Sequence, residues 1–353
     1  MQLASLGWSP RLSALSAMFS HPPHLEPARL VRVERGEVAA ATGSAAIAAA
    51  VAGRLDPAGE PGPPAVGDWV MLDRSSDLAV VRAILPRATT LGRRAAGGPE
   101  RIQVVAANVD LVLLVEGLDR GPNPRRLERG AALAWNGGAT PVVVLTKTEL
   151  ADDLEASLER ARAGAPFVEV IALSAASGAG LSELGRHLRP GPTAVMLGPS
   201  GAGKSTLVNR LLGEERFATG AVRSSDRRGR HTTTRRELVL LPSGGCLIDT
   251  PGVRELGLWL DGEAVSVAFP ELEALAVGCR FRDCRHEGEP GCAVLAAVAA
   301  GELDAARLAS FHRLRGEAEA HERRHDPARR REVRAADRRL SRLVRTVTRQ
   351  KGR

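Results

Sequence analysis

The stretch Ala194-Val-Met-Leu-Gly-Pro-Ser-Gly-Ala-Gly-Lys-Ser-Thr206 decides the fold, because an apolar run leads there into a glycine-rich loop. Residues 198–205 fit the pattern G-x-x-x-x-G-K-[ST] of a phosphate-binding loop between a strand and a helix. Its glycines let successive backbone N–H groups turn toward a phosphate chain, and a helix beginning near Lys204 adds its positive dipole end. We therefore expect a nucleoside triphosphate to bind at Gly198, Pro199, Ser200, Gly201, Ala202, Gly203, Lys204, Ser205 and Thr206.

Two side chains of this loop carry its charged chemistry. Lys204 supplies a full positive charge to the β- and γ-phosphates, so we expect it to act in catalysis as well as in binding. The Ser205 hydroxyl is the expected Mg²⁺ ligand. Glycine loops also close ordinary turns, but the position of this one between a strand and a helix favours the nucleotide site.

From Gln103 onward, strands and helices alternate, which is typical of a parallel α/β sheet. We expect strands over 109–115, 141–145, 167–173, 194–197 and 246–248, and helices over 124–135, 150–163 and 181–188. Open α/β sheets bind ligands beyond the carboxyl ends of their strands, and three further motifs follow predicted strands directly.

The first motif, Thr146-Lys147-Thr148-Glu149, resembles the guanine-reading [NT]-K-x-D of GTPases. There the Lys lies over the base, and the acid accepts hydrogen bonds from a ring N–H and an exocyclic amine, a donor pair that adenine lacks. Glu149 is one methylene longer than the usual Asp, so ATP stays an alternative ligand. A threonine followed by Glu three residues later also fits a helix cap.

The second motif, Ser174-Ala175, resembles the loop whose backbone N–H contacts the guanine carbonyl. The third, Asp249-Thr-Pro-Gly252, predicts that Asp249 holds Mg²⁺ through water and that the Gly252 N–H meets the γ-phosphate. Both follow apolar runs, so we expect them at the same edge of the sheet as the phosphate loop.

A polar loop, Gly229-Arg-His231-Thr-Thr-Thr234, lies between the phosphate loop and the third motif. It is of the kind that closes over Mg²⁺ with a threonine, and we expect Thr233 to be that ligand, with Thr232 and Thr234 as alternatives. Many GTPases orient the attacking water with a Gln after D-x-x-G, but Val253 stands there. His231 is the nearest replacement, and its alternative is a solvated loop histidine.

A cluster of soft ligands, Cys279-x₄-Cys284-x-His286-x₅-Cys292, follows the predicted sheet. Three thiolates and one imidazole complete a closed tetrahedral zinc site, so we expect one Zn²⁺ per chain. The alternatives are a disulfide and a solvated histidine. Cys246, on an apolar strand, is expected to be a small buried side chain.

The N-terminal part has a different pattern. Short alternating runs between 28 and 95, separated by turn residues, predict a small OB-like barrel, whose role is either nucleic-acid binding or purely structural. Before it, the stretch from Leu6 to Leu15 predicts a turn and a short helix.

The charge distribution singles out the C-terminal end. Residues 311–353 hold 15 Lys and Arg against 6 Asp and Glu, a net of +9, which exceeds the +8 of the whole chain. A basic tail of this kind suits contact with RNA, although such tails are often only solvated. No run reaches the ~18 apolar residues of a membrane span, and the first residues lack a basic signal-peptide start, so we expect a cytoplasmic protein.

The order of the motifs is unusual, because the base-reading motif precedes the phosphate loop, whereas an ordinary GTPase carries it near the end. This permutation, the barrel and the Cys/His cluster resemble the RsgA (YjeQ) family of circularly permuted, ribosome small subunit-dependent GTPases. The resemblance is carried by 198–205, 229–233, Asp249-Thr-Pro-Gly-Val-Arg-Glu255 and 279–292, and Glu149 is its clear departure.

The resemblance implies GTP and GDP as ligands, GTP hydrolysis coupled to late maturation of the small ribosomal subunit, and contact with its rRNA. It implies an N-terminal extension over 1–27, an OB-like barrel over 28–98, a circularly permuted α/β P-loop GTPase domain over 99–260 and a zinc-binding helical domain with a basic tail over 261–353. We expect a monomer. A nucleotide-gated RNA-binding module with negligible turnover and a P-loop ATPase are the alternatives.

Overall fold

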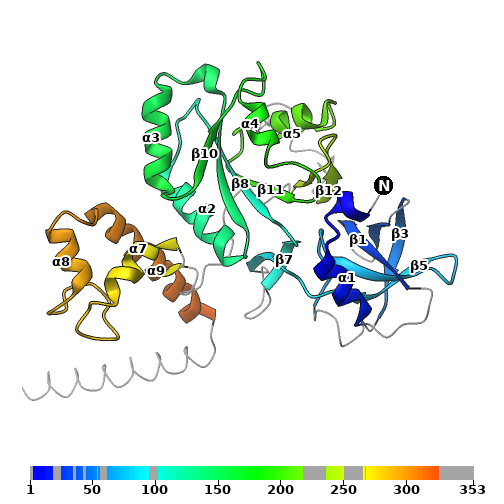
Figure 1. Ribbon diagram of the computed structural model, residues 1–353, viewed down its shortest axis with the longest axis horizontal. Coiled ribbons are helices and arrows are strands. Elements are labelled where there is room, and N and C mark those ends of the chain that lie inside the picture. Colours follow the sequence, from blue (N-terminus) through cyan, green and yellow to red (C-terminus); the bar gives the residue numbers. More distant parts are fainter. Residues whose placement is uncertain are drawn as a thin grey trace, which may run out of the picture. The chain divides into compact units, whose positions relative to one another are not determined.

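The computed structural model describes residues 3–18, 25–34, 37–42, 45–53, 55, 62–94, 102–217, 236–249, 265–266 and 268–325. The chain forms two compact units, one from residues 1–93 and 104–258 and the other from residues 94–103 and 259–353 (Figure 1). Among the helices of the described residues, none combines the length and apolar character that a membrane span requires.

The first unit contains a closed five-stranded β-barrel, which confirms the predicted OB-like part. Its strands are β1 (Leu25–Val33), β2 (Val38–Ala41), β3 (Ala46–Val51), β4 (Trp69–Asp73) and β5 (Ala79–Ile84). The strands pair in the order β1-β2-β3-β5-β4, and β4 closes the barrel on β1. Only β3 and β5 are parallel neighbours. The interior is filled by small side chains such as Ala28, Ala40 and Val81, with Leu30 and Ile84.

The same unit holds the predicted α/β sheet. Its strands are β8 (Leu111–Gly117), β9 (Thr140–Thr146), β10 (Glu169–Ala172), β11 (Thr193–Leu197), β12 (Glu237–Leu240) and β13 (Cys246–Asp249). The order β10-β9-β8-β11-β13 is parallel throughout, and β12 adds to β13 in the antiparallel sense. Barrel strand β1 then pairs with β12 at Arg32 and Glu237, so one sheet runs through both parts.

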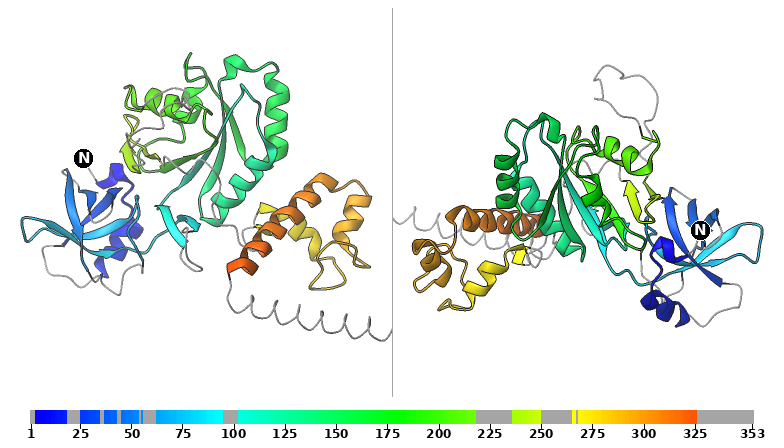
Figure 2. Two further views of the ribbon diagram at one scale, coloured as in Figure 1. Left: turned by 180° about the vertical axis from the view of Figure 1, so that it is seen from behind. Right: turned by 45° about the horizontal axis from the view of Figure 1, so that its top comes forward.

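Helices cover both faces of this sheet (Figures 1 and 2). They are α2 (Pro124–Asn136), α3 (Leu154–Gly164), α4 (Leu181–Gly185) and α5 (Lys204–Leu212). Strand side chains alternate between the two faces: Leu113 and Val115 pack in one cluster with Leu207 of α5, whereas Leu114 lies against Gly130 of α2.

Four sequence-predicted elements differ in their bounds by two residues or more at one end. The helix expected over 181–188 ends at Gly185. The strand expected over 109–115 starts at Leu111, since Asn108 adopts a left-handed conformation with φ 53°. The helix expected from residue 150 is split into a 3-10 turn, Thr148–Leu150, and α3, whose start is fixed by the Asp153 carboxylate accepting from Ala156 N at 3.0 Å. The strand expected over 167–173 is shorter.

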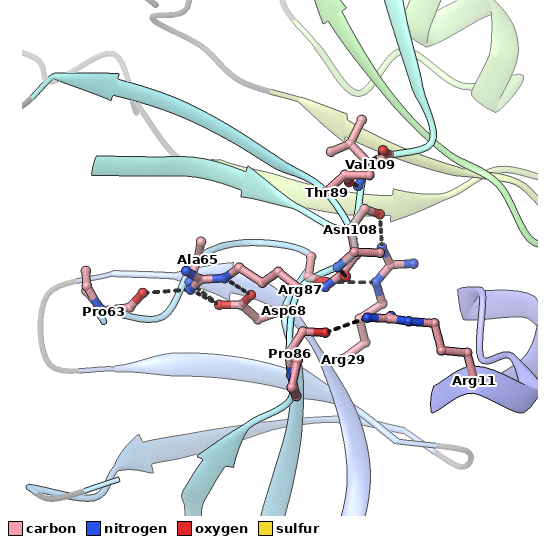
Figure 3. Close-up of polar contacts among 12 residues, drawn as sticks. Arg11, Arg29, Pro63, Ala65, Asp68, Pro86, Arg87, Thr89, Asn108 and Val109 are labelled. Carbon is pink, nitrogen blue, oxygen red and sulfur yellow. Dashed lines mark hydrogen bonds and ion pairs between the residues drawn. The ribbon is translucent and has the colours of Figure 1, made fainter. Parts of the chain in front are cut away.

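The N-terminal segment packs against the barrel and the sheet of its own unit. It consists of a 3-10 turn, Leu3–Leu6, and the predicted helix α1 (Pro10–Ala17). The Arg29 side chain, 1% exposed, donates to the backbone carbonyls of Leu6, Gly67 and Asn108 (Figure 3). Burial lowers the pKa of Arg29. Three carbonyl acceptors compensate for the loss of water around this guanidinium and join three segments of the chain.

The second unit is small and helical. It contains α7 (Pro270–Ala276), α8 (Ala293–Ala299) and α9 (Ala305–His325), and β6 (Thr90–Arg94) and β7 (Ile102–Ala107) pair with each other where the chain passes between the units. Its core includes an edge-to-face pair of Phe269 and Phe311 with centroids 5.4 Å apart. Arg307 lies over Phe269 and donates to Glu271 at 2.6 Å.

Candidate nucleotide site and metal centre

The phosphate loop has the predicted form. Strand β11 ends at Leu197, the loop follows, and α5 begins at Lys204 as expected. A side chain at Gly198 would overlap the carbonyl oxygen of Val115, so only glycine allows the loop to start so close to strand β8. Lys204 Nζ donates to the carbonyl oxygens of Gly198 and Pro199, each at 2.6 Å. The ammonium group is therefore held over the loop, where a phosphate chain would displace these contacts.

The base-reading motif is joined directly to the phosphate loop. Thr146 is the last residue of β9, and its hydroxyl donates to the Ala202 carbonyl oxygen at 2.6 Å. The alternative reading of Thr146 as a helix cap is wrong, because the following 3-10 turn has Lys147 at its cap position and no side-chain cap hydrogen bond. The threonine instead connects two motifs that are 56 residues apart in the chain.

The remaining base-site residues lie at the same edge. Ser174 follows β10 and is buried, and Thr148 N donates to the carbonyl of Leu173 at 3.4 Å, so the two motifs are adjacent. Ser174 Oγ accepts from Ser177 N at 3.1 Å, which shapes the turn that contains Ala175. The Glu149 side chain is exposed.

Of the predicted γ-phosphate and Mg²⁺ groups, the structure describes Ser205 at the start of α5 and the backbone of Asp249. Asp249 ends β13, whose neighbour β11 leads into the phosphate loop. The other predicted residues, Gly252, Val253, His231, Thr232, Thr233 and Thr234, lie outside the described residues, as does the basic segment 326–353. The described groups fit the triphosphate of a nucleotide, since an ammonium group, a helix N-terminus and a hydroxyl lie on one loop.

The sequence analysis did not single out two acidic residues near this edge, Asp119 and Glu116. Asp119, in the loop after β8, forms an ion pair with Lys147, with Oδ1 to Nζ at 3.0 Å. The available signal was its position two residues beyond a buried strand, because the ends of parallel neighbours β8 and β9 meet at Gly117 and Thr146. Glu116 was also missed: it is buried and accepts from Arg126 Nε at 2.5 Å, which fixes α2 to β8 and raises the pKa of Arg126.

The four predicted zinc ligands converge. The ligand atoms of Cys279, Cys284, His286 and Cys292 all lie within 4.8 Å of one another. The Cys279 and Cys292 sulfurs are 3.9 Å apart, and His286 Nδ1 lies 3.3 Å from the Cys292 sulfur and 3.7 Å from that of Cys279. Ligands of a tetrahedral zinc with Zn–S near 2.3 Å are separated by about 3.8 Å. The thiols are free, so the predicted alternative of a disulfide is absent from these described cysteines.

The surroundings of the cluster support metal binding. Burial lowers the pKa of His286, which favours the neutral imidazole that a metal requires. The His286 carbonyl lies 3.1 Å from His312 Nε2 of α9. Glu289 accepts from the backbone N–H groups of Arg285, Glu287 and Gly288, and these hydrogen bonds lower its pKa to about 2. The residues present fit a closed zinc site.

Comparison with known proteins identifies the family. A family model described as RsgA GTPase matches residues 84–259. A model described as ABC transporter matches residues 181–341, a range that also contains the phosphate loop. The small ribosomal subunit biogenesis GTPase RsgA of Opitutus terrae is 46% identical over 343 residues, covering 93% of this chain and 92% of the relative. The protein of the same name from Xanthomonas euvesicatoria is 46% identical over 327 residues, covering 89% and 88%.

Solved structures agree. YjeQ from Thermotoga maritima matches with a TM-score of 0.63 at 25% identity, over 83% of this chain and 98% of that one. YloQ, described as a circularly permuted GTPase, has the same fold, with a TM-score of 0.62 at 23% identity over 85% and 97%. The motif order, the fold and the identity over most of the chain agree, and the chain belongs to the RsgA GTPase family.

Proposed function

We propose that this chain binds GTP and hydrolyses it to GDP and phosphate, that the small ribosomal subunit stimulates this turnover, and that the reaction serves late maturation of that subunit. The observation that carries the proposal is the hydrogen bond from Thr146 Oγ1 to the Ala202 carbonyl, because it brings the base-reading motif against the phosphate loop. The relatives at 46% identity are named small ribosomal subunit biogenesis GTPases.

At the phosphate end, the predicted residues bind phosphate, hold Mg²⁺ and orient the attacking water. Lys204 meets the β- and γ-phosphates, and the Gly252 N–H meets the γ-phosphate. Ser205, Thr233 and Asp249 hold Mg²⁺, which when bound neutralises charge that develops on the phosphate oxygens. His231 takes the place of the missing Gln and orients the attacking water.

At the base end, Lys147 lies over the guanine ring, Glu149 accepts from its N–H groups and the Ser174-Ala175 backbone meets its carbonyl. The exposed Glu149 side chain is long enough to turn toward a base at this edge.

The other parts of the chain supply the ribosomal contacts. One Zn²⁺ on Cys279, Cys284, His286 and Cys292 stabilises the domain over 261–353, and its basic tail contacts rRNA of the small subunit. The remaining proposed domains are the barrel over 28–98 and the GTPase domain over 99–260, and residues 1–27 form an N-terminal extension. The protein acts as a cytoplasmic monomer without membrane insertion.

Titration of GTP, GDP and ATP into wild-type protein, followed by turnover measurements with small subunits and with large subunits as control, tests the proposal. Preference for guanine nucleotides and stimulation by small subunits alone are expected. Tighter ATP binding would support the ATPase reading, and GTP binding without turnover would support a nucleotide-gated RNA-binding module. Thr233→Ala is expected to spare GDP binding and weaken that of GTP.

A further inference from the structure

The loop after strand β8 carries a carboxylate at the base-reading edge. Its backbone is fixed by hydrogen bonds from Leu118 N to the Thr146 carbonyl at 2.9 Å and from Arg120 N to the Gly117 carbonyl at 3.3 Å. The Leu118 side chain is buried and anchors the loop in the core. Asp119 therefore projects from a turn whose position is set by strand β9, the strand that carries the base-reading motif.

Asp119 and Lys147 form a half-buried ion pair, with side chains 30% and 27% exposed and 3.0 Å between Oδ1 and Nζ. A Cβ placed on Gly117 would lie 2.5 Å from Asp119 Oδ1, 3.4 Å from Ala202 Cα and 3.6 Å from Lys147 Cδ. The lysine stem, the carboxylate and the phosphate loop thus surround one glycine. A side chain at Gly117 would push the Asp119 carboxylate out of this position, so the ion pair in this arrangement depends on Gly117.

The backbone of Lys147 points to the same role. Lys147 has φ 59°, a left-handed conformation that is unfavourable for a residue with a Cβ and is kept where the surroundings enforce it. With the backbone in this conformation, the Lys147 ammonium lies against Asp119 and is anchored there. A lysine free to rotate would lose conformational entropy when it stacks on a base, whereas an anchored one has lost it already.

We propose that Asp119 is a positioning residue for guanine-nucleotide binding, which holds the Lys147 ammonium so that the lysine stem is placed for the base before the nucleotide arrives. The inference rests on the proposed function, because it assigns Lys147 to the base. Arg120 Nε, 4.0 Å from Asp119 Oδ2, is exposed and is the other cation facing this carboxylate among the described residues.

The test compares Asp119→Asn with the wild type. Loss of the anchor is expected to weaken GTP and GDP binding about tenfold and to raise KM for GTP, while kcat at saturating GTP is kept. Inorganic tripolyphosphate, which has no base, is expected to bind both proteins equally. Asp119→Glu is expected to recover part of the affinity. Glu155→Gln, which removes a surface ion pair of α3 with Arg162, is the matched control and should bind GTP as the wild type does.

A double-mutant cycle with Lys147→Ala decides whether Asp119 acts through Lys147. In the Lys147→Ala background, Asp119→Asn is expected to cause no further loss. Unchanged GTP affinity in Asp119→Asn, an equal loss of tripolyphosphate binding, or full additivity in the cycle would each overturn the inference. A wild type that binds GTP no better than ATP would instead overturn the proposed function, so the two failures are distinguishable.

Discussion

The nucleotide edge and the Cys/His centre are assembled over very different distances along the chain. Thr146 and Ala202, which join base motif and phosphate loop, are 56 residues apart, whereas Cys279 and Cys292 are 13 apart. The first site needs the whole parallel sheet to bring its parts together. The second closes within one loop and its flanking residues, and depends on an ion more than on the surrounding fold.

The hydrophobic cores beneath the two sites also differ in how many segments of the chain build them. Side chains from five parallel strands, α4 and α5 pack in one cluster beneath the nucleotide edge. The described core of the zinc unit lies among three helices and includes Phe269, Leu272, Val294, Phe311 and Leu314. Loss of bound nucleotide should therefore leave the nucleotide edge folded, whereas loss of zinc should unfold the smaller unit.

The largest expected effect is on the zinc unit. Cys284→Ser removes one of four ligands, and structural zinc stabilises small domains by on the order of 10 kcal/mol, so this protein should lose its metal and the helices of the unit. GTP binding should persist, because the nucleotide edge belongs to the other unit. Elemental analysis, circular dichroism and nucleotide titration measure the three quantities. Asp283→Asn, an exposed neighbour, should keep the metal; wild-type protein with far less than one zinc per chain would contradict the prediction.

On the nucleotide side, Lys204→Ala removes a cation that we propose to make charge-assisted hydrogen bonds to phosphate. GTP and GDP affinity should fall by about 100-fold or more, and turnover with it, since two such bonds contribute about 3 kcal/mol. Zinc content and thermal unfolding of the second unit should not change. Isothermal titration calorimetry measures the affinities, and Arg210→Gln on the exposed side of α5 is the control.

His231→Ala tests the replacement of the missing Gln. GTP and small-subunit binding should be retained, but stimulated turnover should fall by about 100-fold, a typical contribution from a positioned proton-accepting group. Single-turnover hydrolysis with saturating small subunits is the measurement. Undiminished stimulation would show that the water is oriented by another group.

A substitution at Thr146 removes the hydrogen bond that joins the base-reading motif to the phosphate loop. Thr146→Val leaves the buried Ala202 carbonyl without its hydroxyl donor, which should weaken GTP binding by about 1–2 kcal/mol, or roughly tenfold. Thr146→Ser keeps the hydroxyl and should bind GTP nearly as the wild type does. Equal losses in both variants would mean that the methyl group, and not the hydrogen bond, holds the two motifs together.

The smallest effect is expected within the zinc loop. Glu289→Gln weakens the hydrogen bonds that the carboxylate accepts from three backbone N–H groups between Arg285 and Gly288, so zinc affinity should fall several-fold without loss of the fold. Competition with a chromogenic chelator measures this affinity. An unchanged affinity would mean that the four ligands alone organise the loop.

Features that depend on residues close together in the chain could be predicted from the sequence, whereas those that depend on distant residues could not. The phosphate loop, α2 and the Cys/His cluster depend on local spacing, and the structure has them where the sequence places them. The start of α3 was misplaced, because Asp153 is a stronger cap than any residue near 150.

Two features depend on contacts that spacing does not reveal. In strand β3, Ala46–Val51, four of the six residues are alanine, which has little strand preference. The strand forms because β2 and β5 flank it in a barrel with a small interior. The partner of Asp119 is Lys147, which follows it by 28 residues in the chain. The two side chains meet only when β8 and β9 lie side by side.

The pairing of β1 with β12 has a consequence for solubility. β12 is the outermost strand of the nucleotide-binding sheet, and an uncovered outermost strand offers unpaired N–H and C=O groups to other chains. The barrel strand covers this edge at Glu237 and brings Arg32, a charged residue, to it. A chain shortened to begin after the barrel would keep its phosphate loop but present a backbone template for self-association. At this residue pair the barrel strand occupies an edge position that would otherwise be open to a second chain.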